Sequence, residues 1–250
     1  MSELRVALVT GGAKRIGAAI VTALADAGFA VVIHCNTSQV EAEALVAAIQ
    51  SKGGKAAVVA ADLADPAAVN GLMAAACKPF GPVTLLVNNA SVFLADTLHT
   101  IDVPTWNRQF SVNIRAPSML AKDMAALLPA NRKGTIINII DQRVWKLTPE
   151  FYSYTLSKAA LWAATRTMAQ TLAPRIRVNA VGPGPTLGNM HDGDKGVLHE
   201  AAGVPLQRQV TPSEIAAAVV YLANADSVTG QMIAVDGGQH IGWKTPDIVG

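Results

Sequence analysis

Short apolar runs rich in β-branched residues alternate along the chain with alanine-rich segments whose apolar residues fall three or four positions apart. The runs predict buried strands at residues 5–10, 30–34, 56–61, 84–88, 135–140, 177–181 and 232–235. The alanine-rich segments predict helices, among them residues 16–27, 40–51, 67–77 and 154–172. Parallel strands need helical crossovers and are buried on both faces. The pattern therefore predicts an α/β fold, a doubly wound parallel sheet with helices on both faces (Rossmann-like).

The organisation of the chain favours a single domain. Its 250 residues contain no Pro/Gly/Ser-rich linker, tandem repeat or low-complexity tract, and 51% of them are apolar. One domain over residues 1–250 is the expectation. Residues 182–210 lack clear periodicity and are rich in Gly and Pro, which predicts a substrate lid within 185–210.

Charge and cysteine content indicate which partners to expect. Lys plus Arg (20) nearly balances Asp plus Glu (18), and the basic residues are scattered, which argues against a nucleic-acid or membrane surface and favours a small-molecule substrate. Cys35 and Cys77 stand alone, without a disulfide pattern or metal-ligand spacing, so no metal is expected. The chain shows neither a leader peptide nor an apolar stretch long enough to span a bilayer, and a cytoplasmic location is expected.

A glycine-rich turn joins the first predicted strand to the first predicted helix. It reads Thr-Gly-Gly-Ala-Lys-Arg-Ile-Gly over residues 10–17. Gly11 permits a tight turn, Gly17 permits close packing of helix on strand, and the exposed amides at the helix start attract a pyrophosphate. A plain structural turn is the alternative, but the strand-turn-helix context favours a dinucleotide site.

The end of the second predicted strand indicates which dinucleotide binds. From His34 to Ser38 there is no Asp or Glu, whereas an NAD site places a carboxylate there for the ribose 2′-hydroxyl. Arg15, beside Lys14, could meet a 2′-phosphate, and Ser38 and His34 could donate hydrogen bonds to it. NADPH is therefore predicted over NADH. The alternative is that Lys14 and Arg15 are ordinary solvated charges.

A tyrosine and a lysine four residues apart form the candidate catalytic pair. Tyr154 and Lys158 fall on one face of a predicted helix. A phenol has a reference pKa of about 10, and a nearby ammonium favours the phenolate and lowers that pKa. Tyr154 is thus the predicted proton donor. A tyrosine and a lysine at this spacing occur often by chance, but their presence together with the glycine-rich turn makes the prediction stronger.

Motifs across nearly the whole chain resemble the short-chain dehydrogenase/reductase family. They are the turn at residues 10–17, Asp62-Leu63, Asn88-Asn89-Ala90, Asn113, Tyr154 to Lys158, Asn179, Pro183-Gly184 and Asp236-Gly237-Gly238. The resemblance implies an NADP-dependent oxidoreductase in which Asn113 belongs to a proton relay. It also implies a homotetramer. Together with the turn and the second strand, it gives the expected cofactor contacts: Gly11, Lys14, Arg15, Ile16, His34, Ser38, Asp62, Leu63, Asn89, Ala90, Ser91, Tyr154, Lys158, Pro183, Gly184 and Thr186.

Two departures from the common family pattern resemble the pteridine reductases within it. Arg15 replaces a glycine of the turn, and Asp141 replaces the usual catalytic serine. The stretch from Ser91 to Phe93 is similar to the one that meets the pterin in that subfamily, although Thr37 stands where its arginine contacts the 2′-phosphate. The resemblance implies catalysis by Asp141, Tyr154, Lys158 and Asn113, and substrate binding by Arg15, Ser91, Phe93, Asp141 and Tyr154.

The predicted function is NADPH-dependent reduction of a pterin or folate-type ring, and two alternatives stay open. One is a generic carbonyl reductase for a ketone or acyl substrate, for which a serine at position 141 would be expected. The other is a cofactor-binding sensor that does no chemistry, against which the Tyr154/Lys158 pair argues. Individual residues have structural alternatives too, because Phe93 could be a core aromatic and Asp141 could cap the turn after its strand.

Overall fold

A parallel sheet of seven strands in the order β3-β2-β1-β4-β5-β6-β7 forms the centre of the protein. The computed structural model describes residues 4–186 and 193–243. The strands are β1 (Val6–Val9), β2 (Ala30–Cys35), β3 (Ala56–Ala60), β4 (Leu85–Asn88), β5 (Gly134–Ile139), β6 (Ile176–Pro183) and β7 (Met232–Val235). Each neighbouring pair is parallel. The predicted strands and the predicted doubly wound fold are therefore confirmed.

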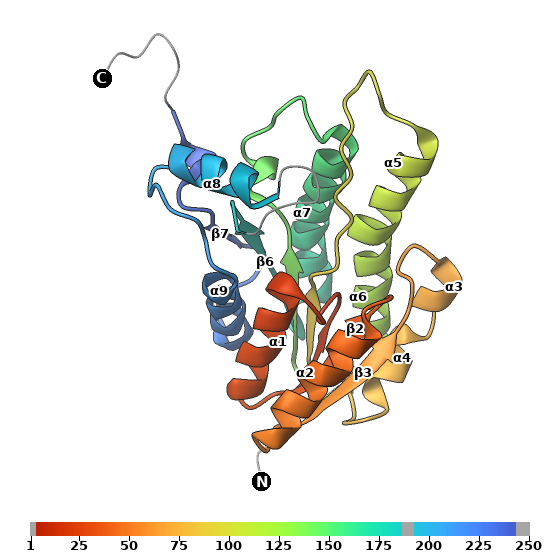
Figure 1. Cartoon of the computed structure of the whole chain (residues 1–250). Coiled ribbons are helices and arrows are strands. Elements are labelled where there is room, and N and C mark those ends of the chain that lie inside the picture. The colour runs from red at the N-terminus through yellow and green to blue at the C-terminus, as the bar shows by residue number, and fades with distance from the viewer. Residues whose placement is uncertain (1–3, 187–192, 244–250) are drawn as a thin grey trace.

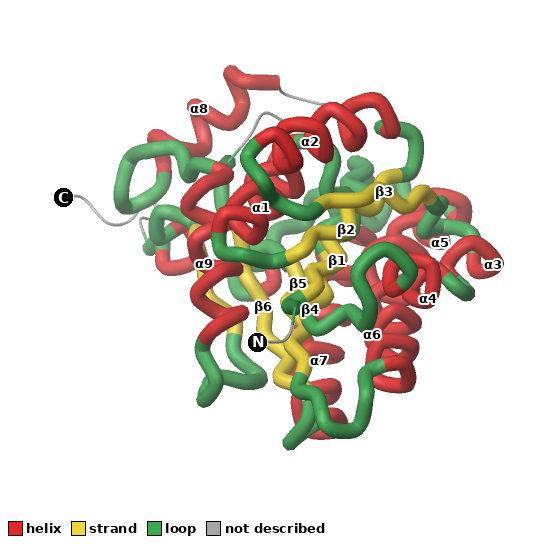
Figure 2. Tube along the Cα trace, turned by 90° about the horizontal axis from the view of Figure 1, so that it is seen from below, coloured by secondary structure: helices red, strands yellow, loops and turns green. Residues whose placement is uncertain are grey.

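Helices cover both faces of the sheet, as Figure 1 and the view from below in Figure 2 show. One face carries α1 (Arg15–Asp26), α2 (Gln39–Ser51) and α9 (Pro212–Asn224). The other carries α3 (Pro66–Val69), α4 (Leu72–Cys77), α6 (Ala116–Leu127) and α7 (Tyr152–Leu172). The remaining helical segments are α5 (Val103–Phe110), η1 (Ser111–Arg115), η2 (Gln142–Val144), α8 (Gly193–Gly203) and η3 (Gln239–Ile241).

The strand sequences are apolar at successive positions because both sides of the sheet are buried. In β1, Ala7 and Val9 pack into the cluster under α1, α2 and α9. Val6 and Leu8 pack into the opposite cluster, under α4 and α6. Successive side chains of a strand point to opposite faces, so a strand between two helical layers needs apolar residues at every position.

Some helices differ from those predicted. The helix predicted over residues 67–77 is interrupted, because Gly71 adopts a left-handed conformation with φ of 96° between α3 and α4. The helix predicted from Tyr154 begins at Tyr152. Part of the predicted lid is helical, since α8 lies within it, while residues 187–192 lie outside the described residues. In the part of the chain that the structure describes, no helix has the length and apolar character needed to cross a bilayer.

The topology places the candidate site at the carboxyl ends of the central strands. The strand order reverses between β1 and β4, and ligands of open α/β sheets bind at such a switch point. The turn after β1, the loop after β4 and the segment after β5 all emerge there (Figure 1). The start of α7 and the end of β6 complete this edge.

Candidate active site

The turn between β1 and α1 is compact because its glycines leave no room for side chains. Gly11 has φ of 60°, in the left-handed region that glycine adopts readily. A Cβ on Gly17 would stand 2.1 Å from the carbonyl oxygen of Gly11. Arg15 also has a positive φ, of 56°, which is uncommon for a residue with a side chain. The tight turn and the close helix packing predicted for these glycines are confirmed.

His34, near the carboxyl end of β2, is hydrogen-bonded to this turn. Its side chain is 2% exposed, and its Nδ1 accepts a hydrogen bond from the N–H of Gly11 at 3.1 Å. Its Nε2 lies 3.1 Å from the carbonyl oxygen of Ala61 and donates to it, because Nδ1 is the acceptor. Burial lowers the pKa of His34 to about 4, so the ring is neutral near pH 7. Both ring nitrogens are therefore occupied, and the hydrogen bond from His34 to a 2′-phosphate that the sequence suggested is not available in this arrangement.

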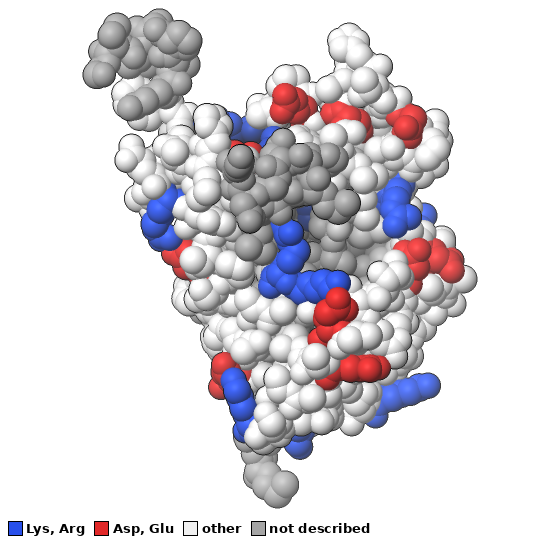
Figure 3. All heavy atoms as spheres, in the orientation of Figure 1, with Lys and Arg blue, Asp and Glu red and all other residues white. Residues whose placement is uncertain are grey.

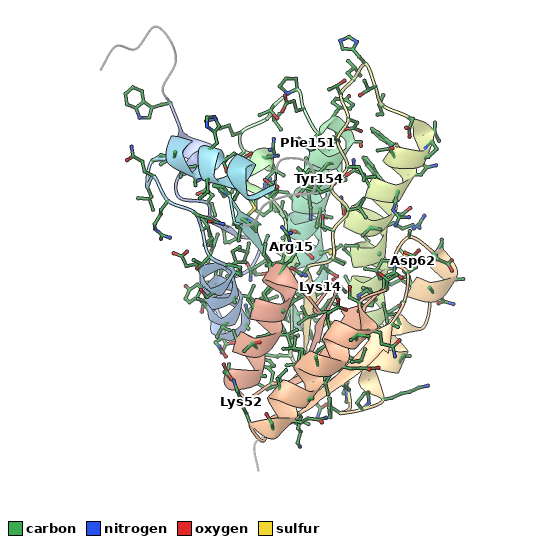
Figure 4. All side chains as sticks on the ribbon, viewed as in Figure 1. Lys14, Arg15, Lys52, Asp62, Phe151 and Tyr154 are labelled. Atoms are coloured by element: carbon green, nitrogen blue, oxygen red, sulfur yellow. The ribbon has the colours of Figure 1, made fainter. Side chains whose placement is uncertain are left out.

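The other residues expected near the adenosine half of a dinucleotide lie around the start of α2 and the end of β3. Lys14 is exposed and its Nζ pairs with Glu41 of α2 at 2.6 Å. Ser38 precedes α2 and is partly exposed. Asp62 accepts a hydrogen bond from the N–H of Ala64 at 2.9 Å, and Figure 4 shows it apart from Arg15 and Tyr154, towards α3. Leu63 beside it is buried.

Hydrogen bonds tie the loop after β4 to the glycine-rich turn. The Thr10 hydroxyl oxygen accepts from the N–H groups of Asn89 at 2.9 Å and Ala90 at 3.0 Å. The Asn89 side-chain amide donates to the carbonyl oxygens of Thr10 at 2.9 Å and Gly11 at 3.0 Å. The two segments therefore hold each other in place at the switch point.

Asn113 joins the same loop to α7 from the π-helical segment η1. Its Oδ1 accepts from the N–H of Val92 at 2.9 Å and from the Ser91 hydroxyl at 3.2 Å. Its Nδ2 donates to the carbonyl oxygen of Val92 and to the Ser157 hydroxyl, both at 3.0 Å. These bonds use the hydrogen-bonding capacity of the Asn113 side chain. They give that side chain a positioning role, while its part in a proton relay stays a prediction.

Asp141 and Tyr154 form a direct hydrogen bond at the centre of the site. The Tyr154 hydroxyl donates to Oδ2 of Asp141 at 3.0 Å. The other oxygen, Oδ1, accepts from the N–H of Arg143 at 2.8 Å and caps η2. The cap considered as an alternative is thus present, and the contact with Tyr154 is present with it.

Burial raises the pKa of both members of this pair. Desolvation raises the pKa of Asp141, an effect that the Arg143 N–H partly offsets. Desolvation and the neighbouring Asp141 raise the pKa of Tyr154 well above its usual value. This direction is opposite to the lowering by Lys158 that the sequence predicts, because burial and Asp141 dominate the shift. The Lys158 Nζ donates to the Ile139 carbonyl oxygen at 2.9 Å and lies 5.7 Å from the Tyr154 ring centroid. Burial also lowers the pKa of Lys158 to about 8.

An aromatic stack lines the site above this pair. The rings of Phe93 and Phe151 are stacked, with centroids 4.2 Å apart and an angle of 17° between planes. Phe93 meets the Tyr154 ring edge-on, with centroids 4.6 Å apart. Phe151 directly precedes α7 with φ of 53°, and Figure 4 shows it above Tyr154. Non-glycine residues held at positive φ tend to occur at functional sites, and Arg15 and Phe151 both occur here.

A buried carboxylate fixes the start of α7 against the loop that carries Phe93. Asp96 accepts from the N–H of Ser153 at 3.1 Å and from its hydroxyl. Gln109 of α5 donates to that same hydroxyl at 2.7 Å. A carboxylate is stabilised at a helix N-terminus by the unpaired N–H groups and the helix dipole. Tyr154 and Phe93 are thereby held in a fixed relation.

These segments enclose a cavity of about 420 Å³ and an adjoining one of about 190 Å³. The predicted residues that line one or both are Arg15, Ile16, Asn89, Ser91, Phe93, Asp141, Tyr154, Lys158, Pro183, Gly184 and Thr186. The predicted residues outside both linings are Gly11, Lys14, His34, Ser38, Asp62, Leu63, Ala90 and Asn113. Figure 3 shows Lys and Arg side chains below a hollow in this face, at the start of α1.

Several lining residues were not predicted from the sequence. They are Gln142, Arg143 and Gln239, whereas Pro185, Val197 and Glu200 lie within the lid predicted at residues 185–210 without having been named as site residues. Arg143 follows Asp141 by two positions, which is a signal that could have suggested it. Glu200 and Gln239 come from α8 and η3, and no motif marks either residue.

Comparison with known proteins places the chain in a family. The family model described as Enoyl-(Acyl carrier protein) reductase matches residues 11–240. Together with the parallel sheet, the glycine-rich turn and the Tyr154/Lys158 pair, this match shows that the chain belongs to the short-chain dehydrogenase/reductase family and is an oxidoreductase.

Relatives and solved structures of this family are similar over nearly their whole lengths. An uncharacterised oxidoreductase of Methylorubrum extorquens is 40% identical, covering 95% of this chain and 99% of the relative. A 3-oxoacyl-[acyl-carrier-protein] reductase of Synechocystis is 33% identical, covering 94% and 96%. The crystal structure of FolM alternative dihydrofolate reductase 1 from Brucella canis, complexed with NADP, is 52% identical with a TM-score of 0.95, covering 98% of this chain and 97% of that one.

Proposed function

We propose that the protein reduces a pterin or folate-type ring with NADPH. The observation that carries this proposal is the 3.0 Å hydrogen bond from Tyr154 to Asp141 beside Phe93 in one cavity. The similarity to FolM alternative dihydrofolate reductases from Brucella canis and Brucella suis, both 52% identical, supports it.

The residues at the switch point fit a dinucleotide. Gly17 leaves no room for a Cβ, so the turn packs closely against the start of α1. The exposed N–H groups at this helix start stabilise a pyrophosphate. The adjoining cavity is lined by Arg15, Ile16, Asn89 and Lys158, which would lie along the cofactor. Pro183, Gly184 and Thr186 would close over its nicotinamide end. When bound, NADPH supplies the hydride.

The preference for NADPH that we propose rests on the positive charges in the glycine-rich turn. The FolM structures contain NADP, and Arg15 places a permanent cation at the turn. Lys14 pairs with Glu41, so its ammonium is already partly neutralised by a carboxylate. Lys14 and Arg15 are the cations that we propose for the 2′-phosphate, with Ser38 as a further donor, and the cofactor preference of Arg15→Ala would separate this role of Arg15 from a contact with the substrate.

Tyr154 and Asp141 would supply the proton that ring reduction requires. Addition of hydride to the carbon of a ring C=N bond leaves a nitrogen that must take up one proton. The pKa of Tyr154 is raised well above its usual value, so its hydroxyl carries a proton near neutral pH, and burial also raises the pKa of Asp141. General acids are most effective when their pKa lies near the operating pH, so the upward shift of the Asp141 pKa favours Asp141 as the acid, with the Tyr154 hydroxyl hydrogen-bonded to it as the relay.

Phe93 would select a flat ring. Stacked aromatic rings gain about 1 kcal/mol beyond the burial of their area, and a small aliphatic ketone gains little of this. Phe151 on one side of Phe93 fixes the orientation of the ring. Arg15 and Ser91, in the same lining, would hold the polar edge of a pterin.

A second candidate is a carbonyl reductase acting on a ketone or acyl substrate. It is favoured by the sequence relatives named 3-oxoacyl-[acyl-carrier-protein] reductase, at 31% to 33% identity. Asp141 argues against it, because a carboxyl group stands where that chemistry is expected to use a serine to polarise the carbonyl oxygen.

The test is NADPH oxidation with dihydrofolate, a neutral dihydropterin and simple ketones. We expect turnover of the first two, and we expect Asp141→Ser to lower kcat/KM for them more than for ketones. Brisk ketone turnover without turnover of either pterin would replace the proposal with the second candidate. On the family resemblance we also propose a cytoplasmic homotetramer, whose mass light scattering would measure.

A further inference from the structure

An arginine and a glutamate that the proposed chemistry does not use lie side by side in the lining of the 420 Å³ cavity. Arg143 comes from η2 and Glu200 from α8, and their charged groups are 3.9 Å apart. The N–H of Arg143 holds Asp141, so the position of this residue relative to the proton donors is fixed. The positive charge of Arg143 is thus fixed near the place where the substrate ring would bind.

The guanidinium of Arg143 is oriented before any ligand arrives. It lies 5.1 Å from the centroid of the Phe151 ring, and its Nη1 donates to the Thr148 hydroxyl at 3.1 Å. The side chain is 16% exposed and lines the cavity. A planar guanidinium that is held in this way matches a carboxylate with two parallel hydrogen bonds.

The pairing with Glu200 is weak enough for a ligand to replace. At 3.9 Å the two groups lie beyond hydrogen-bond distance, and the Glu200 side chain is 43% exposed. Exposed ion pairs of this kind contribute little to stability. A carboxylate that reached Arg143 at hydrogen-bond distance would gain more, while the charge of Glu200 would oppose its approach.

We propose that Arg143 recognises an anionic tail on the substrate, an inference that rests on the proposed function. A folate-type substrate carries its pterin ring on an aminobenzoyl-glutamate, which bears carboxylates. A pterin with a neutral side chain has no group for Arg143 to bind. The site therefore favours the folate-type substrate over the neutral pterin.

Steady-state kinetics with two substrates tests this inference. The probes are dihydrofolate and 6-methyl-7,8-dihydropterin, with wild type, Arg143→Gln and Glu200→Gln. We expect Arg143→Gln to raise the ratio of KM for dihydrofolate to KM for the neutral pterin by about tenfold, which corresponds to about 1.4 kcal/mol. We expect Glu200→Gln to lower the same ratio, because it removes a negative charge from the approach.

A surface arginine provides the matched control. Arg108→Gln removes the same charge from the exposed side of α5 and should leave the ratio unchanged. Arg143→Lys should recover part of the preference, since it restores the charge without the planar donor. Calorimetric titration of folate into the enzyme with NADP⁺ measures binding apart from turnover and should show the same order among the variants.

The outcomes separate the two proposals. If wild type reduces both pterins and Arg143→Gln changes both KM values equally, or neither, the anionic-tail inference is overturned and the proposed function stands. If wild type reduces neither pterin, the proposed function fails and the inference fails with it. Unchanged thermal unfolding of Arg143→Gln would show that its effect does not come from loss of folding.

Discussion

The buried neutral His34 makes the stability of the protein sensitive to mild acid. Its pKa is about 4 in the folded chain against a usual value of 6.5. Between these two pH values the unfolded chain binds a proton that the folded chain does not, so the free energy of unfolding falls as pH falls from 6.5 towards 4. At about 1.36 kcal/mol per pH unit, the full loss is about 3 kcal/mol, and it is absent above pH 6.5.

Replacement of His34 by glutamine should remove this loss. The glutamine amide can offer an acceptor to Gly11 and a donor to Ala61 but does not titrate. Urea unfolding from pH 7.5 to 4 would compare wild type, His34→Gln and His99→Gln, the last an exposed histidine as control. We expect His99→Gln to follow wild type and His34→Gln to lose less stability in acid. Parallel pH profiles for wild type and His34→Gln would refute the assignment of His34 as a neutral support of the turn.

Four further predictions concern the site. Tyr154→Phe should lower kcat by at least about 100-fold, as loss of a general acid does, with NADPH affinity by fluorescence titration within a few-fold of wild type. Gly17→Ala should weaken NADPH binding and lower Tm because its Cβ would stand 2.1 Å from a main-chain oxygen, whereas Gly203→Ala, with open space around it, should do neither. Arg15→Ala should raise KM for NADPH more than for NADH; equal increases would place the guanidinium elsewhere. Phe93→Ala should raise KM for a dihydropterin more than for a simple ketone, and a uniform increase would argue against ring stacking.

The sheet was predictable from the sequence, while part of the helical layer was not. A strand buried on both faces reads as a continuous apolar run, and each of the seven runs became a strand. The segment from 67 to 77 kept helical spacing but contains Gly71, whose positive φ ends α3 and starts α4. Helical periodicity therefore predicted that this segment is helical, but not that Gly71 divides it into two helices.

The reactive pair was predictable because its residues belong to motifs, whereas the individual residues that η2, α8 and η3 contribute to the cavity were not, although α8 lies within the predicted lid. Tyr154 and Asp141 stand at recognisable positions, whereas Glu200 and Gln239 reach the cavity from α8 and η3, far apart along the chain. The role predicted for His34, a hydrogen bond to the cofactor, also differs from the one that the structure gives it. Its place at the carboxyl end of a strand suggests a cofactor contact, but the turn packed above it takes both ring nitrogens.

The structural role and the proposed catalytic role of Asp141 do not exclude each other. From the sequence, a cap after β5 and a partner for Tyr154 were alternatives for the same carboxylate. The two oxygens are separate acceptors, and the structure gives Oδ1 to the Arg143 N–H and Oδ2 to the Tyr154 hydroxyl. The cap fixes the direction in which Oδ2 points, so the structural role sets the geometry of the chemical one. A substitution that removes both acceptors therefore alters the turn that carries Arg143 as well as the proton supply, and the ratio of KM for dihydrofolate to KM for the neutral pterin, rather than kcat alone, separates the two effects.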